Sequence, residues 1–331
     1  MNIISCAICG STNSKKLLTS YDKYIRVDNT KFTLVRCRVC ELVYLNPQPT
    51  MEELVKYYPS HYPSYLPEYK VLEENRLLEF LKGIKKLITP PSSPSTSSSN
   101  EISSDTSRLR VLDFGCGSGR FLLSMRLAHP LWELHGFDIS TNKEIKSIGH
   151  DIPIILDTPD AIGSYFEHES FDRIYLNNVL EHVNDPVATL RMLTTLLRLD
   201  GEMAIEVPNI NSIKFKIFRS NFFPLEIPRH LYHFSPSTLT KLCTKCGLSI
   251  INVQKIGSAK GTVRSLYYAL GIHKDKIDPL LLLVIDKMSK LMGEKWINDD
   301  SMIAHVKKAV PNQSDAQKDV LSTHRNEEAS S

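Results

Sequence analysis

Residues 111–120 read VLDFGCGSGR, in which an apolar run typical of a buried strand leads directly into three closely spaced glycines. Gly115, Gly117 and Gly119 allow the backbone to turn sharply and to approach a bound ligand closely. The residues that follow fit a helix, whose first amides are free to contact that ligand. This segment therefore predicts an α/β fold with a ligand site where its first strand ends.

Two acids narrow the class of ligand. Asp138 ends the next predicted strand, where a carboxylate can accept both hydroxyls of a ribose. Asp113 directly precedes the glycines, which follow the order G-x-G-x-G rather than the G-x-G-x-x-G of dinucleotide-binding proteins. A negative charge at that position disfavours a pyrophosphate and suits a cationic nucleoside. The pattern favours S-adenosylmethionine.

Strand and helix patterns alternate from Arg108 to about residue 310, which predicts a mostly parallel sheet with helices on both faces. With this context, VLDFGCGSGR, Asp138 and the later NNVLEHV resemble the motifs of class I S-adenosylmethionine-dependent methyltransferases. The resemblance covers residues 108–308 and implies a Rossmann-like sheet whose last strand, 301–308, is antiparallel. It implies a cofactor site made by Asp113, Gly115, Gly117, Gly119, Asp138, Asp157 and Asn177. Two interpretations of Asp157 stay open, a neighbour of the adenine and an exposed loop acid or helix cap.

The segment FDRIYLNNVLEHV, residues 171–183, carries a predicted strand into a loop at the carboxyl end of the sheet. His182 is the first candidate for a base that removes a proton from the acceptor; the alternative is a histidine that only hydrogen-bonds the backbone. Some related methyltransferases bind a divalent metal here through Glu-x-x-Glu-His. Asn178 replaces the first Glu in this chain, so metal-assisted catalysis is only a minor alternative.

A second acceptor-side segment is IPRHLYHFSPSTL, residues 227–239, which precedes a predicted helix. It resembles a loop of bacterial methyltransferases that act on sugars, lipids and other small metabolites. Arg229, His230 and His233 are its candidate catalytic side chains, suited to an anionic or hydroxylated substrate. In the alternative, only Arg229 and His230 face the cleft, while Tyr232 and His233 pack under the sheet.

Four cysteines near the N-terminus form two tight pairs, CAIC and CRVC. Cys6, Cys9, Cys37 and Cys40 predict a structural Zn²⁺ site, because four thiolates complete a tetrahedral cage and leave no open position. The sequence CRVCELVYLNPQP, followed by EELVKYY, resembles an N-terminal module of methyltransferases from bacterial glycan and nucleotide-sugar pathways.

We divide the chain into five segments by composition and periodicity. They are a zinc-binding module 1–49, a helical segment 50–88, a Ser/Pro-rich flexible linker 89–107, a methyltransferase domain 108–310 with a helical insertion 261–293, and a disordered tail 311–331.

A net charge of +3 is too balanced for a chain that mainly neutralises nucleic-acid phosphates. The first residues lack the features of a secretory signal, so we expect a cytoplasmic protein. The apolar run 279–292 is either an interfacial helix at the inner membrane face or an amphipathic helix that covers the sheet. The leading function is methyl transfer to a small molecule, sugar or lipid-linked glycan. The alternatives are an RNA methyltransferase and a non-catalytic scaffold.

Overall fold

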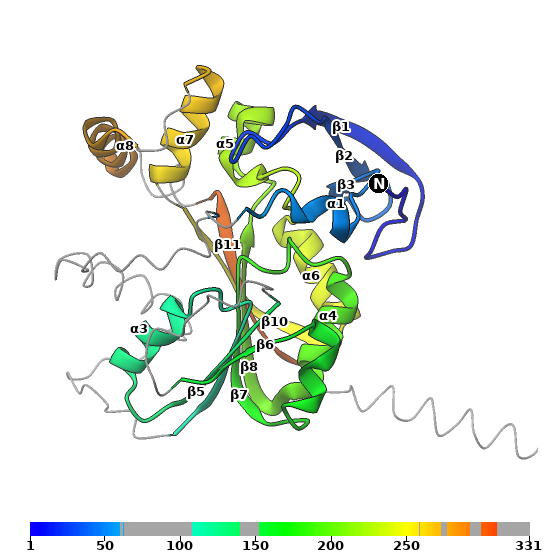
Figure 1. Ribbon diagram of the computed structural model, residues 1–331, viewed down its shortest axis with the longest axis vertical. Coiled ribbons are helices and arrows are strands. Elements are labelled where there is room, and N and C mark those ends of the chain that lie inside the picture. Colours follow the sequence, from blue (N-terminus) through cyan, green and yellow to red (C-terminus); the bar gives the residue numbers. More distant parts are fainter. Residues whose placement is uncertain are drawn as a thin grey trace, which may run out of the picture.

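The computed structural model describes residues 1–59, 62, 108–139, 152–257, 259–272, 277–291 and 299–309. Its centre is a sheet of seven strands in the order β10-β11-β8-β7-β4-β5-β6 (Figure 1). The strands are β4 Arg110–Phe114, β5 Glu133–Asp138, β6 Ile154–Leu156, β7 Phe171–Asn177, β8 Leu197–Pro208, β10 Leu248–Ile256 and β11 Ser301–Lys308.

Strand direction confirms the predicted α/β class. The pairs β4–β5, β4–β7, β5–β6 and β7–β8 are parallel. The last strand, β11, lies between β8 and β10 and is antiparallel to both. Central strands of such a sheet are buried on both faces, which explains the nearly continuous apolar run in Arg110–Phe114.

Helices cover both faces of this sheet (Figure 1). Helix α3, Arg120–Ala128, lies on one face, while α4, Pro186–Leu196, and α6, Pro236–Lys245, lie on the other. Side-chain caps fix the starts of the last two: the Asp185 carboxylate accepts two backbone amides, and the Ser235 hydroxyl accepts one. Proline follows each cap, where a missing N–H costs nothing.

A second sheet joins the N-terminal residues to this domain. It has the order β1-β2-β3-β9, formed by Ser14–Ser20, Phe32–Cys37, Val43–Leu45 and Tyr232–His233. The last of these strands comes from the segment before α6, and it pairs antiparallel with β3. The module that carries the cysteines is therefore hydrogen-bonded to the domain that carries the glycine loop.

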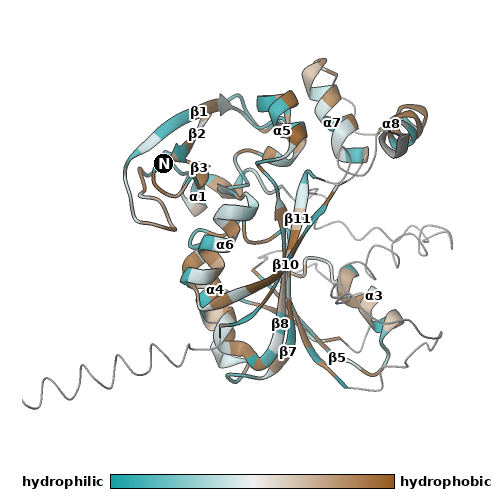
Figure 2. Cartoon of the chain, turned by 180° about the vertical axis from the view of Figure 1, so that it is seen from behind, coloured by the Kyte–Doolittle hydropathy of each residue, from teal (hydrophilic) through white to brown (hydrophobic). Residues whose placement is uncertain are grey.

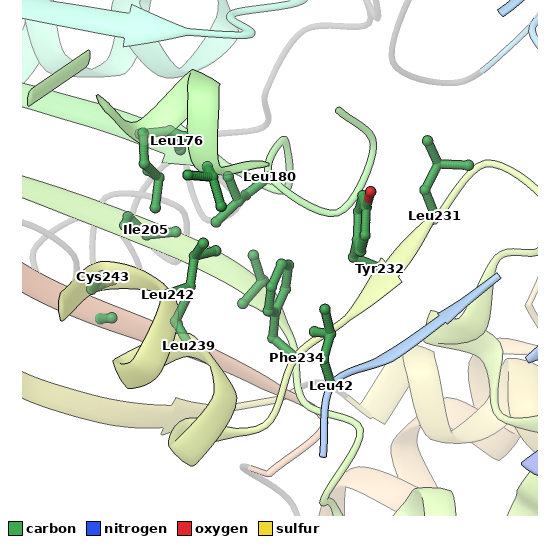
Figure 3. Close-up of a cluster of buried hydrophobic side chains, with 14 of the residues drawn as sticks. Leu42, Leu176, Leu180, Ile205, Leu231, Tyr232, Phe234, Leu239, Leu242 and Cys243 are labelled. Carbon is green, nitrogen blue, oxygen red and sulfur yellow. The ribbon is translucent and has the colours of Figure 1, made fainter. Parts of the chain in front are cut away.

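The hydrophobic core is continuous across this junction. Figure 3 shows Leu42 of the N-terminal module close to Phe234, with Leu239 and Leu242 of α6 on the other side. These side chains belong to one buried cluster that also includes strands β7 and β8. Burying apolar surface lowers the free energy of the folded chain. The two units therefore stabilise each other through this shared core.

The remaining elements lie around the carboxyl ends of the parallel strands. They are α1 Met51–Val55, α5 Ile213–Phe218, α7 Ala259–Ala269, α8 Pro279–Leu291 and the 3-10 helices η2 Pro159–Ser164, η3 Arg219–Asn221 and η4 Phe223–Leu225. A capping box begins α1, with reciprocal bonds between Thr50 and Glu53.

Helix α8 lies beside α7 at the edge of the molecule and is hydrophobic along much of its length (Figure 2). Leu280, Leu283 and Val284 are exposed. No helix among the described residues is both long and apolar enough to cross a bilayer. The contact with a membrane surface through 279–292 stays a prediction.

Several predicted segments lie outside the described residues. These are most of the helical segment 50–88, the linker 89–107, parts of the insertion 261–293, and the tail 311–331.

Candidate active site

The glycine loop follows β4 and precedes α3, as predicted. Gly115, Gly117 and Gly119 all have positive φ angles, of 77°, 51° and 75°. A Cβ at Gly115 would lie 2.4 Å from a methyl of Val179. Only glycine combines this backbone conformation with so close an approach. The loop therefore leaves backbone rather than side chains facing the ligand.

Asp138 ends β5 beside this loop. Its Oδ2 accepts a hydrogen bond from the Gly117 amide at 2.7 Å, and its side chain is almost fully buried. Both residues line the same cavity. The carboxylate is therefore held in a fixed position at the cavity wall, which fits the ribose clamp expected for S-adenosylmethionine.

Asp113 lies deeper, under the loop. Its side chain is buried, and its Oδ1 accepts a hydrogen bond from Asn177 at 3.2 Å. Burial raises the pKa of Asp113 to about 7, against the lowering effect of the Asn177 bond. A cation bound near this carboxyl would favour its charged form.

Asp157 and Gly119 are not among the residues that line the cavity. The Asp157 carboxylate accepts the Thr158 amide at 2.7 Å and the Tyr165 hydroxyl at 2.6 Å. This geometry corresponds to the loop-acid interpretation of Asp157. Gly119 caps α3 instead, with its amide bonded to Cys116.

A cavity of about 970 Å³ extends from the glycine loop to α1 and the residues after it. It is lined on the cofactor side by Gly115, Gly117, Asp138, Ile139 and Asn177, and elsewhere by residues that include Tyr58, Tyr62, His182, Glu226 and His230. The fold thus brings two of the four candidate catalytic residues, His182 and His230, into one space with the cofactor loop.

His182 lies at the wall of the cavity beside Tyr58. Its Nδ1 is 2.9 Å from the Tyr58 hydroxyl. Burial lowers the pKa of His182 to about 3, so the ring is neutral. The ring therefore shapes the loop at this wall of the cavity.

His230 packs edge-to-face against His182, with ring centroids 4.5 Å apart. Its Nδ1 lies 2.9 Å from the Pro224 carbonyl, while its Nε2 makes no hydrogen bond to a described residue. Ligand atoms of Glu181, His182 and His230 lie within 4.8 Å of one another. The minor alternative of a metal at this segment stays a prediction.

Arg229 and His233 do not line the cavity. The Arg229 guanidinium is fully buried and bonds to Asp22 at 2.7 Å, Glu226 at 3.0 Å and the Tyr57 carbonyl at 3.1 Å. His233 is buried as part of β9, which corresponds to the alternative in which it packs inside the protein. Full burial and these three bonds keep the Arg229 guanidinium away from the cavity.

Sequence analysis missed several polar residues of the cavity. Tyr62 donates to Glu226 at 2.6 Å, and burial raises the pKa values of Glu206 and Asp300. The position of Glu206 at the carboxyl end of a predicted strand could have indicated it. Glu226 and the tyrosines carried no comparable signal, because Tyr58 and Tyr62 meet His182 and Glu226 only through contacts between distant parts of the chain.

The four cysteines lie together as predicted. Sγ atoms of Cys6 and Cys40 are 3.3 Å apart, and those of Cys9 and Cys37 are 3.5 Å apart. Tetrahedral Zn–S bonds of about 2.3 Å separate sulfurs by slightly more. Lysines of α6 donate to the carbonyls of Cys40 and Ile8, next to the two cysteine turns. Nearby positive charge suits a cage of four thiolates.

Comparison with known proteins decides the family. Residues 73–253, more than half of the chain, match the family described as "Methyltransferase domain". The chain belongs to this methyltransferase family. It is a class I S-adenosylmethionine-dependent enzyme, as its glycine loop and sheet indicate.

The curated relatives agree with this assignment. The chain is 26% identical over 178 residues to a ubiquinone biosynthesis O-methyltransferase of Nitrosospira multiformis, covering 50% of this chain and 72% of the relative. The corresponding protein of Aromatoleum aromaticum is 26% identical over 183 residues, covering 50% and 74%. A methyltransferase structure from Archaeoglobus fulgidus superposes with a TM-score of 0.43 and 18% identity, covering 61% and 86%. That superposition adds nothing to the strand order described above.

Proposed function

We propose that this methyltransferase methylates a hydroxyl group of a small molecule, with sugars and lipid-linked glycans as the leading acceptor class. The observation that carries this proposal is the single cavity shared by the Gly115–Gly117 loop, Asp138 and His230. The relatives named above are O-methyltransferases, which supports oxygen as the acceptor atom.

On the cofactor side, Asp138 would hold the ribose hydroxyls, and the loop amides and Asn177 would contact the remainder of the cofactor. Asp113 would add negative charge beneath them. S-adenosylmethionine supplies a methyl carbon made electrophilic by the positively charged sulfur. The protein must therefore align the acceptor with that carbon and remove its proton.

His230 is the best placed of the candidate side chains to take this proton. Its Nδ1 faces a carbonyl, which only accepts, so the neutral ring carries its hydrogen there and has a lone pair on Nε2. Burial lowers the pKa of His230, so the ring is neutral before reaction. We assign His182, His233 and Arg229 to supporting positions around it, with no direct contact to the acceptor.

Zn²⁺ in the four-cysteine cage completes the proposal. It would link the two turns that contain Cys6 and Cys37, and so fix the module directly before α1 and the tyrosines that line the cavity. Four protein ligands leave no position for a substrate, so its role is structural.

The test is a transfer assay with zinc-loaded full-length chain, S-adenosylmethionine and a panel of nucleotide sugars, lipid-linked glycans and phenols, with product identified by mass spectrometry. We expect methylation of a hydroxylated small molecule. His230→Gln should lower the rate at least about 10²-fold, the usual contribution of a general base, while cofactor binding by calorimetry is retained. Methylation of RNA alone would favour the nucleic-acid alternative. Absence of cofactor binding to a folded, zinc-loaded chain would favour the scaffold.

A further inference from the structure

The Glu226 carboxylate lies at the wall of the cavity with only one of its two oxygens engaged. Oε1 accepts from Arg229 Nε at 3.0 Å and from the Tyr62 hydroxyl at 2.6 Å. Oε2 accepts no hydrogen bond from any residue that the structure describes. The side chain is only 12% exposed, so water reaches this oxygen poorly. A hydrogen donor on a ligand in the cavity would supply what Oε2 lacks.

A second unpartnered acceptor lies beside it. His230 Nε2 is 3.8 Å from Glu226 Oε2, and the His230 side chain is 6% exposed and lines the same cavity. The Pro224 carbonyl at 2.9 Å takes the hydrogen of Nδ1, so Nε2 carries a lone pair. Since both atoms are acceptors, they share no hydrogen with each other. Each of them needs its own donor from a ligand.

The position of Oε2 is set before a ligand binds. Arg229, which holds Oε1, is itself fixed by Asp22 at 2.7 Å and by the Tyr57 carbonyl at 3.1 Å. The Glu226 carboxylate therefore cannot turn toward a ligand without breaking this buried arrangement. A preorganised pair of acceptors selects ligands by the spacing of their donors.

The charge of the cavity lining excludes one class of ligand. The described residues that line it include four acids and neither lysine nor arginine; the acids are Asp138, Glu206, Glu226 and Asp300. Arg229 and Lys214 pair with two of these acids from outside the lining. An anionic group next to His230 would face Glu226 with no cation from these lining residues, so charge repulsion disfavours it.

We propose that Glu226 is a specificity-determining residue, which selects acceptors that carry a hydroxyl or amino group on the carbon next to the reactive hydroxyl. This inference rests on the proposed function. The reactive hydroxyl donates to His230 Nε2, and the neighbouring group donates to Glu226 Oε2. Hydrogen bonds of about 2.8 Å from two neighbouring groups can reach two acceptors at this spacing. The substrate class is therefore a vicinal diol or amino alcohol without an adjacent anion.

The reaction itself is unchanged by this selection. As the reactive oxygen bonds to the methyl carbon, the carbon–sulfur electron pair stays on sulfur. The oxygen keeps the O–H electron pair, and the proton moves to His230 Nε2. The hydrogen bond to Glu226 Oε2 is kept throughout, so Glu226 acts by positioning the acceptor.

The test uses single-ring probes that differ next to one hydroxyl. Their Kd values for zinc-loaded full-length chain saturated with S-adenosylhomocysteine are measured by calorimetry. Catechol and ortho-aminophenol carry a neighbouring donor, whereas guaiacol carries a neighbouring methoxy group, salicylate a carboxylate and resorcinol a more distant hydroxyl. We expect the first two to bind at least about tenfold more tightly than the other three, the lower limit for a hydrogen bond to a charged group.

The variant Glu226→Gln should reverse the order of catechol and guaiacol. Arg229 and Tyr62 both donate, so the new amide would turn its oxygen toward them and its NH₂ group toward the cavity. A purely structural role would weaken all probes alike. Glu202→Gln is the matched control, because Glu202 also bonds to an arginine and a histidine but does not line the cavity. It should keep the wild-type order.

Equal binding of catechol, resorcinol and guaiacol to the wild-type chain, or no binding of catechol, would overturn the inference. An unchanged order in Glu226→Gln would also overturn it. If that variant does not fold, the wild-type order decides. Binding of S-adenosylhomocysteine is measured first on the same sample. Loss of cofactor binding, which contradicts the proposed function, is thereby distinguished from loss of selectivity among the probes.

Discussion

Asp22 and Arg229 form an ion pair at 2.7 Å in which both side chains are fully buried. Asp22 lies in the loop between β1 and β2, where its carboxylate also accepts the amides of Tyr24, Ile25 and Val27. Arg229 directly precedes His230. One buried charge pair therefore connects the loop of the N-terminal module to the ring that faces the acceptor.

Loss of this pair should destabilise the whole chain. Arg229→Met leaves the Asp22 charge buried without its cation, which typically costs about 3–5 kcal/mol. The free energy of unfolding, measured by urea denaturation, should fall by that amount. Arg198→Met removes the exposed bond to Asp172 and should leave the free energy near the wild-type value. Equal effects of the two substitutions would show that the buried pair has no special role.

The ribose clamp predicts a selective loss of cofactor binding. Asp138→Ala removes a charged acceptor whose hydrogen bonds are worth about 3 kcal/mol together, so the Kd for S-adenosylmethionine should rise about 100-fold. Asp157→Ala should change the Kd little, because that carboxylate is occupied by Thr158 and Tyr165. Calorimetry on both variants is the measurement. A comparable loss in Asp157→Ala would restore it as a neighbour of the adenine.

Asp113 should make cofactor binding depend on pH. Burial raises its pKa to about 7, above its value in the unfolded chain. The free energy of unfolding therefore falls as pH rises from the unfolded pKa to about 7. A cationic ligand favours the carboxylate. Below pH of about 7 binding must therefore release a proton, and affinity should rise up to about tenfold per pH unit.

Calorimetry in two buffers of different ionisation enthalpy would count the released proton directly. Asp113→Asn should abolish the pH dependence below neutrality, with weaker binding at high pH. A wild-type affinity that does not change across this range would mean that Asp113 keeps one protonation state.

The glycine loop allows two causes of strain to be separated. Gly115 and Gly247 have nearly equal φ angles, of 77° and 76°, but a Cβ would meet Val179 only at Gly115. Gly247→Ala should cost only the backbone term of about 1–2 kcal/mol. Gly115→Ala should lower the free energy of unfolding by about 1–3 kcal/mol more, because the new Cβ overlaps Val179. It should also weaken cofactor binding. Thermal unfolding with and without cofactor compares them.

The zinc proposal makes a stoichiometric prediction. Cys9→Ser should lower bound zinc from about one equivalent to none and destabilise the module, because metal binding contributes to folding. Cys246→Ser, a buried thiol outside the cage, should retain the metal. Zinc content by mass spectrometry and urea unfolding test both. Retention of a full equivalent in Cys9→Ser would rule out a four-thiolate site.

Local sequence determined those parts of the protein that depend on short segments. The strand Arg110–Phe114, the glycines after it and Asp138 are fixed by apolar runs, backbone conformation and strand ends, all of which act over a few residues. The capping box of Thr50 and Glu53 is equally local. The cysteine pairs are two such short segments, and their grouping followed from thiolate chemistry alone.

Tertiary structure alone decided the acceptor side. Arg229 and His230 are adjacent in the sequence, yet the Arg229 guanidinium is buried in an ion pair with Asp22, whereas His230 lines the cavity. That difference depends on partners up to 207 residues away, brought together by the pairing of β3 with β9 and by the shared core. Sequence patterns show which side chains are present. Long-range packing determines which of them are left without a partner, and only those can act on a substrate.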